Sequence, residues 1–159
     1  MSDEIVMTPI GRVVCGRTEP IDDDWDAVTC DVVLDDRFPA DALAGLAEFS
    51  HVDVVFVFDQ VDEADITYGA RHPRSNPDWP EVGIFAQRAK MRPNRIGVTT
   101  CPLLGIDGRV LHVRGLDAID GTPVLDVKPY MREFGPRVMT TQPPWATELM
   151  ASYWERAKA

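Results

Sequence analysis

Residues 82–100, VGIFAQRAKMRPNRIGVTT, place a short cationic segment between two apolar runs. Arg88, Lys90, Arg92 and Arg95 put four cations into eight residues, and Pro93 restricts the backbone among them. The apolar runs at 82–86 and 96–98 predict a buried strand on each side. The pattern therefore predicts a rigid cationic loop that can bind an anionic group, although the spacing alone equally fits a solvated basic turn.

A second stretch, GLDAIDGTPVLDVKPY at residues 115–130, predicts a tight turn followed by a strand. The turn is formed by the four residues Asp120, Gly121, Thr122 and Pro123. Its glycine permits close approach of the backbone, so that turn amides can meet a ligand directly. Asp126, Lys128 and Tyr130 alternate and therefore share one face of the strand. Asp126 is expected either to pair with Lys128 or to orient or deprotonate an attacking amine.

A third stretch, LAEFSHVDVVFVFDQ at residues 46–60, contains the run of β-branched and aromatic residues that is typical of a central strand. Further strands are expected near residues 8–16, 30–36, 82–87, 96–106, 109–116 and 122–130. Helices are expected at 40–49 and 145–157, a hairpin turn at 105–108 and a long loop at 68–81. Short strands joined by short connections predict a mainly β fold, an antiparallel barrel or strongly curled sheet.

Length and composition predict one soluble domain covering residues 1–159. Hydrophobic residues make up 45% of the chain and charged residues 26%, as in ordinary globular proteins. No apolar run reaches the roughly 18 residues that a membrane span needs, and the acidic N-terminus lacks a signal-peptide pattern. Cys15, Cys30 and Cys101 are expected to be buried, reduced thiols in a cytoplasmic protein. Their spacing, with that of the histidines, gives no metal site.

The net charge of −10 is unevenly distributed. Residues 1–70 hold 17 acidic and 3 basic residues, whereas residues 71–95 hold 6 basic and 2 acidic residues. A broad nucleic-acid surface needs many cations to neutralise phosphates. The distribution argues against such a surface and against DNA as a partner, but it permits a local anion-binding site.

The three stretches, in this order, resemble the TsaA/TrmO-like family of S-adenosylmethionine-dependent methyltransferases. In the family, the first stretch runs FATRS and then RPNPIG. Eight positions match, namely Phe85, Ala86, Arg88, Arg92, Pro93, Asn94, Ile96 and Gly97. Gln87, Ala89 and Arg95 depart from the family residues, and Arg95 adds charge where the family is neutral. The resemblance covers about residues 9–134 and implies a single small antiparallel β-barrel with one or two short helices and a C-terminal helix.

The resemblance also implies roles for particular residues. Those implied to contact S-adenosylmethionine are Asp59, Gln60, Arg88, Val98, Asp120, Gly121, Thr122 and Pro123. The residues implied to lie near the substrate are Arg71, Arg74, Arg92 and Arg95, and the candidate catalytic residues are Asp126 and Tyr130. Trp25 is most simply a core or interface residue, with adenine stacking as a second possibility. No catalytic base is required, because alignment of donor and acceptor can dominate methyl transfer.

The family's best-known activity implies N6-methylation of a modified adenosine beside the tRNA anticodon. Two alternatives remain open at this point. One is a methyltransferase that acts on a small molecule or another nucleoside, and the other is a protein that binds S-adenosylmethionine without turnover. The resemblance further implies a homodimer, and no membrane partner is expected.

Overall fold

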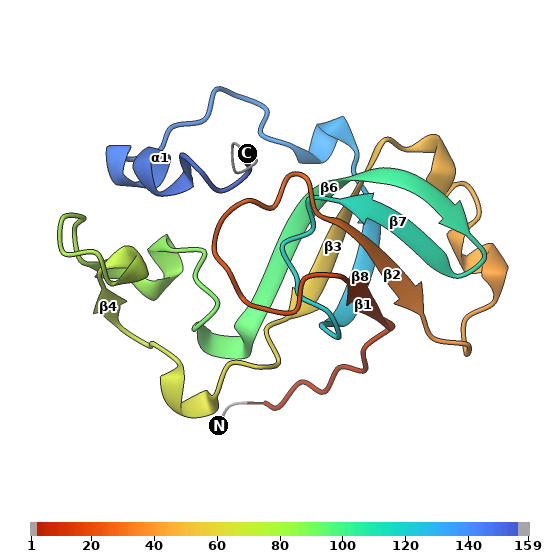
Figure 1. Cartoon of the computed structure of the whole chain (residues 1–159), viewed down its shortest axis with the longest axis horizontal. Coiled ribbons are helices and arrows are strands. Elements are labelled where there is room, and N and C mark those ends of the chain that lie inside the picture. Colours follow the sequence, from red (N-terminus) through yellow and green to blue (C-terminus); the bar gives the residue numbers. More distant parts are fainter. Residues whose placement is uncertain (1–2, 156–159) are drawn as a thin grey trace.

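The computed structural model describes residues 3–155, which form one closed barrel with short helices around it (Figure 1). The barrel order is β1-β2-β7-β6-β3-β8, with antiparallel pairing throughout. Its strands are β1 (Gly11–Cys15), β2 (Thr29–Leu34), β3 (His51–Val57), β6 (Ile96–Asp107), β7 (Val110–Arg114) and β8 (Pro123–Pro129). The expected antiparallel β-barrel is therefore confirmed.

The barrel closes around an apolar core supplied by alternate residues of its strands. In β3, Val52, Val54 and Phe56 are buried, while the residues between them are half-exposed. This alternation is what the side-chain period of two produces when one face of a strand is buried. Opposite Phe56 in the register lies Gly97. A Cβ added at Gly97 would lie 2.5 Å from the Phe56 ring, so the core leaves no room for a side chain there.

A second, two-stranded sheet lies outside the barrel and is formed by β4 (Ala70–Arg71) and β5 (Val82–Gly83). In Figure 1 it lies on the same side of the barrel as α1 (Pro144–Met150). The Trp79 indole N–H donates a 2.8 Å hydrogen bond to Glu148 of α1, so the long loop and the helix are in contact. No helix within residues 3–155 has the length and apolar character that crossing a bilayer requires.

Several sequence-based boundaries are wrong. The helix expected at 40–49 is two 3-10 helices, Ala40–Leu43 and Leu46–Glu48, because Gly45 between them has a φ of 84°. The strand expected at 82–87 ends at Gly83 and continues as the 3-10 helix Ile84–Ala86. The hairpin turn expected at 105–108 lies instead at residues 108–109, because β6 extends to Asp107.

The remaining short helices lie in loops. Glu63–Asp65, Pro73–Ser75, Pro93–Arg95 and Arg132–Phe134 are 3-10 helices. The C-terminal helix expected at 145–157 is confirmed in type, but it spans only Pro144–Met150 and turns follow it. The last residues of that expected helix, 156 and 157, lie outside the described residues.

The expectation of three reduced thiols is wrong for two of them. Cys15 and Cys30 are directly paired in the β1–β2 register, with a Cα–Cα separation of 4.7 Å, and the structure joins them as a disulfide. Cys101 is the free thiol, and it is fully buried. Burial, together with the charges of Asp117 and Asp53, raises the pKa of Cys101 to about 12, so the thiol stays protonated at neutral pH.

Candidate functional site

The first half of β6 presents one open edge, and Arg88 lies against it. Between β6 and β3, the Leu103 amide donates to the Ser50 carbonyl at 2.9 Å, and the Phe58 amide donates to the Arg95 carbonyl at 2.8 Å. Every second residue of β6, counted back from Leu103, therefore turns its backbone groups toward β3. Val98 is one of the residues between these, so its carbonyl points away from β3. On that side β7 pairs only with the Leu103–Asp107 part of β6. The Val98 carbonyl instead accepts a 2.8 Å hydrogen bond from the exposed guanidinium of Arg88.

The other arginines of the cationic loop (residues 88–95) are also held by backbone oxygens. Arg92 donates to the Gln87 carbonyl at 2.5 Å, and Arg95 donates to the Val61 carbonyl at 2.7 Å. Among residues 3–155, no carboxylate forms an ion pair with Arg88, Lys90, Arg92 or Arg95. Backbone carbonyls therefore fix the loop without neutralising its charge, which leaves it able to attract an anion.

Gln87, which replaces the usual threonine of the family, has a structural role in this chain. Its side chain is 7% exposed and donates to the carbonyls of Arg71 and Val82, at 3.0 and 2.9 Å. The buried amide therefore joins the root of the cationic loop to both strands of the small sheet.

Arg71 and Arg74 are close in sequence but differ in their partners. Arg74 forms an ion pair with Asp23 at 2.9 Å, so much of its charge is offset within the chain. Arg71 packs its guanidinium against the Met91 sulfur, at 3.9 Å, and its buried Nε has no hydrogen-bond partner in the described structure. Arg71 forms no ion pair within residues 3–155, so it is the stronger candidate for an external anion.

The turn Asp120–Pro123 is bonded to β1 and its loop, which contradicts the expectation that its amides face a ligand. The Asp120 and Gly121 amides each donate at 2.8 Å, to the carbonyls of Arg17 and Val13. Asp120 Oδ1 accepts a 2.9 Å hydrogen bond from the Cys15 amide. What remains available to a ligand is the second carboxylate oxygen of Asp120 and the open space beside Gly121, where an added Cβ would meet nothing within 4 Å.

Asp117 is a functional candidate that the sequence interpretation missed. It lies between the buried residues Leu116 and Ala118, and it accepts hydrogen bonds from the Thr99 hydroxyl and the Tyr153 hydroxyl. Asp117 therefore links β6, the approach to the Asp120 turn and the C-terminal segment. Its place between two apolar residues was the available signal in the sequence, whereas its partners could not be read from the spacing.

Asp126, Lys128 and Tyr130 lie on the β8 side of the barrel wall, beside β3. Asp126 forms a 2.8 Å ion pair with Lys128, and this hydrogen bond raises the pKa of the exposed Lys128. Asp126 is opposite Val55, which is in turn opposite Val98. Since neighbouring strands lie about 4.8 Å apart, the Cα atoms of Asp126 and Val98 are about 10 Å apart. Within residues 3–155, no hydrogen bond or ion pair joins Asp126 or Tyr130 to Arg88.

Asp59 and Gln60 are exposed in the turn after β3, close to the cationic loop because Arg95 bonds to the adjacent Val61 carbonyl. Trp25 is 3% exposed, and the Arg17 guanidinium covers its ring at 4.1 Å. Adenine stacking on Trp25 is therefore wrong for this conformation.

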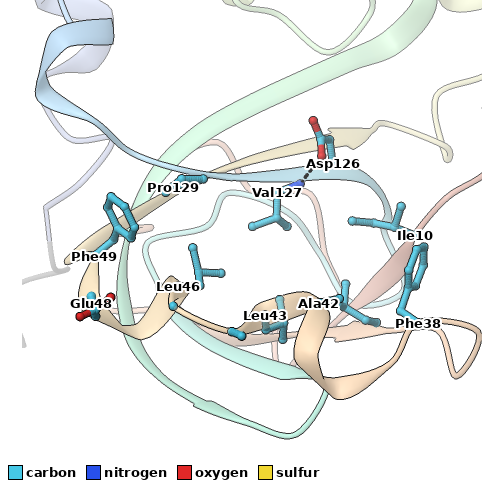
Figure 2. Close-up of a pocket in the computed structure, with 13 residues that line it drawn as sticks. Ile10, Phe38, Ala42, Leu43, Leu46, Glu48, Phe49, Asp126, Val127 and Pro129 are labelled. Atoms are coloured by element: carbon cyan, nitrogen blue, oxygen red, sulfur yellow. Dashed lines mark hydrogen bonds between the residues drawn. The ribbon is translucent and has the colours of Figure 1, made fainter.

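Two cavities lie on the barrel. The first, about 540 Å³, is bounded by the two 3-10 helices at 40–48 and by β8, and its lining is mostly apolar (Figure 2). The Asp126 carboxylate points away from it and accepts a 2.9 Å hydrogen bond from the Val127 amide. The second, about 690 Å³, is lined by residues of the first ten positions together with Asn94, Arg95 and Pro123. It is the cavity that the cationic loop and the Asp120 turn share.

The family described as the tRNA-methyltransferase O N-terminal domain matches residues 18–135. The chain belongs to this family. A tRNA (adenine(37)-N6)-methyltransferase of Mus musculus is 41% identical over 96 residues, which are 60% of this chain and 22% of the relative. A protein of Pseudomonas aeruginosa described as an S-adenosylmethionine-dependent methyltransferase is 43% identical over 91 residues, which are 57% of this chain and 39% of that protein.

Solved structures agree with the family assignment. The crystal structure of TrmO from Pseudomonas aeruginosa superposes with a TM-score of 0.73 at 30% identity, covering 91% of this chain and 63% of that one. The predicted family is thus confirmed. The chain spans between a fifth and two fifths of the length of the two curated relatives, so their activities belong to longer proteins.

Proposed function

We propose that this domain transfers a methyl group from S-adenosylmethionine to N6 of a modified adenosine beside the anticodon of tRNA. The proposal rests on the placement of Arg88, which matches the arginine of the family motif. Its guanidinium is fixed on the Val98 carbonyl and forms no ion pair within residues 3–155. A relative described as a tRNA (adenine(37)-N6)-methyltransferase supports the activity, and a relative described as an S-adenosylmethionine-dependent methyltransferase supports the cofactor.

The side chains around the open edge of β6 fit the chemical groups of S-adenosylmethionine. Arg88 can pair with its carboxylate, and the free oxygen of Asp120 can accept from ribose hydroxyls. Phe85 and Val98, which are 76% and 43% exposed, offer apolar contact for adenine. We propose the same eight cofactor residues as the resemblance implies.

The bound cofactor supplies an electrophilic methyl group on a sulfonium. In the transfer the sulfur–carbon bond breaks, a nitrogen–carbon bond forms, and the nitrogen releases one proton. We propose that Asp126 orients the amine and receives this proton, with Lys128 holding the carboxylate and Tyr130 beside it. Alignment is the larger contribution, because holding two reactants in place removes most of the entropic barrier.

The net charge of −10 favours one alternative, an acceptor that is a small molecule or another nucleoside. Isothermal titration with S-adenosylmethionine, followed by measurement of S-adenosylhomocysteine during incubation with bulk tRNA, tests the proposal. Binding and tRNA-dependent product are expected. Product that forms without tRNA methylation would support the alternative acceptor, and binding without any product would identify a non-catalytic binding protein.

If tRNA is the acceptor, its phosphates must meet cations that form no ion pair within residues 3–155, and we propose that Arg71 is central among them. We propose that Arg71, Arg92 and Arg95 make these contacts, with Arg74 assisting. Arg71→Ala is expected to weaken tRNA binding and to reduce the slope of log affinity against log salt by about 0.7–0.9, the value for one phosphate contact.

The matched control for this test is Arg74→Ala, whose charge Asp23 already offsets. It is expected to change the slope less than Arg71→Ala does. S-adenosylmethionine affinity should stay nearly constant in both variants. An affinity for tRNA that does not change between low and physiological salt would contradict contact between Arg71 and a phosphate.

We also propose a homodimer, since two-fold dimers are the commonest closed assemblies. The exposed apolar residues Val138 and Met139 are available for such an interface. Light scattering at tens of micromolar chain is expected to give twice the chain mass of 17.7 kDa, and a monomer mass would refute the dimer.

A further inference from the structure

The segment after α1 folds back onto the barrel beside the open edge of β6. The amides of Asp24 and Trp25 donate to the carbonyls of Ser152 and Tyr153, at 3.3 and 3.0 Å. A Cβ added at Gly115 would lie 3.7 Å from the Trp154 ring, so this ring packs on the chain leading to Asp117. The segment lies beyond residues 18–135, the part that the family match covers.

Tyr153 is the residue of this segment that reaches the candidate site. Its hydroxyl donates to one oxygen of Asp117, and the Thr99 hydroxyl donates to the other. Burial and the negative charge of Asp117 raise the pKa of Tyr153, so the hydroxyl remains a donor at neutral pH. The positive charge of Arg88 acts on the pKa of Tyr153 in the opposite direction.

The contacts of Asp117 and of Arg88 fall on adjacent residues of β6. Arg88 is bound to the Val98 carbonyl, and Thr99 is the next residue of β6. With both of its oxygens held by hydroxyls, the Asp117 carboxylate has a fixed orientation and forms no ion pair within residues 3–155. If one hydroxyl were removed, a half-buried oxygen would lose its donor, and the charged fork of Arg88, which is held on the adjacent Val98 carbonyl, would be an alternative donor.

We propose that Tyr153 is a positioning residue that holds Asp117 away from Arg88 and so keeps Arg88 available for the anionic end of the cofactor. This inference rests on the proposed function for the identity of the ligand. It assigns the C-terminal segment a part in the cofactor site.

Tyr153→Phe tests the proposal, because it removes the hydroxyl and retains the ring. S-adenosylmethionine affinity, measured by isothermal titration, is expected to fall about tenfold. In the double variant Tyr153→Phe with Asp117→Asn, affinity should return to within about threefold of the starting chain, since a neutral amide cannot neutralise Arg88. A purely structural role of Tyr153 would not predict this recovery. The control is Tyr68→Phe, because Tyr68 is 72% exposed and its hydroxyl forms no hydrogen bond within residues 3–155.

A second measurement does not depend on the cofactor. The rate at which phenylglyoxal modifies Arg88, followed by peptide mass spectrometry, is expected to fall in Tyr153→Phe and to recover in the double variant. An unchanged modification rate together with unchanged cofactor affinity in Tyr153→Phe would overturn the inference. Tighter cofactor binding in this variant would also overturn it, because the C-terminal segment would then obstruct the site. Absence of S-adenosylmethionine binding by the unaltered chain would instead defeat the proposed function, and the modification rates would still decide the role of Tyr153.

Discussion

Arg88→Ala is expected to weaken S-adenosylmethionine binding by about 1.5–3 kcal/mol, or roughly 10- to 150-fold, without unfolding the barrel. The guanidinium is exposed and its one bond within residues 3–155 is to the Val98 carbonyl, so its removal costs the fold little. The loss comes from the ligand carboxylate, which would have no charged partner. Isothermal titration measures the change, and circular dichroism verifies the fold.

Arg109→Ala is the matched control for this variant. Arg109 also donates to a backbone carbonyl, that of Phe38 at 2.5 Å, but it lies in the β6–β7 hairpin turn. Its replacement should leave cofactor affinity unchanged. Arg88→Lys should recover only part of the binding, because an ammonium lacks the planar fork that matches a carboxylate. A folded Arg88→Ala variant with full affinity would remove the cationic loop from the site.

Phe56→Ala is expected to lower the free energy of unfolding by about 3–5 kcal/mol, the range for truncating a buried phenylalanine. Phe56 is 1% exposed, and its ring contacts Phe58 edge-on with a centroid separation of 5.3 Å. The same ring fills the space opposite Gly97, at the start of β6. A loss of this size is a large part of the 5–15 kcal/mol that stabilises a typical domain.

Urea unfolding provides the measurement, and Phe134→Ala provides the comparison. Phe134 is 85% exposed, so its truncation is expected to change the free energy of unfolding by less than about 0.5 kcal/mol. Equal effects of the two substitutions would mean that Phe56 is not part of the packed core.

The sequence by itself determined the β architecture. The run of β-branched and aromatic residues predicted β3, and the runs around β6, β7 and β8 predicted strands that the structure contains. The family motif also predicts that Arg88 and the Asp120 turn border a common site, and this stays a prediction. These features depend on residues that are close in sequence, where side-chain period and turn chemistry act directly.

Only the tertiary structure decided how distant residues meet. The disulfide follows from the register that places Cys15 opposite Cys30, and the amides of the Asp120 turn are occupied because β1 and its loop lie beside them. The helix expected at 40–49 is broken because Gly45 adopts a φ of 84°. Asp117 meets Thr99 and Tyr153 only after the barrel has closed and the C-terminal segment has folded back over it. Hydrogen-bond partners that are 18 and 36 residues away leave no local pattern in the chain, so barrel closure alone specifies them.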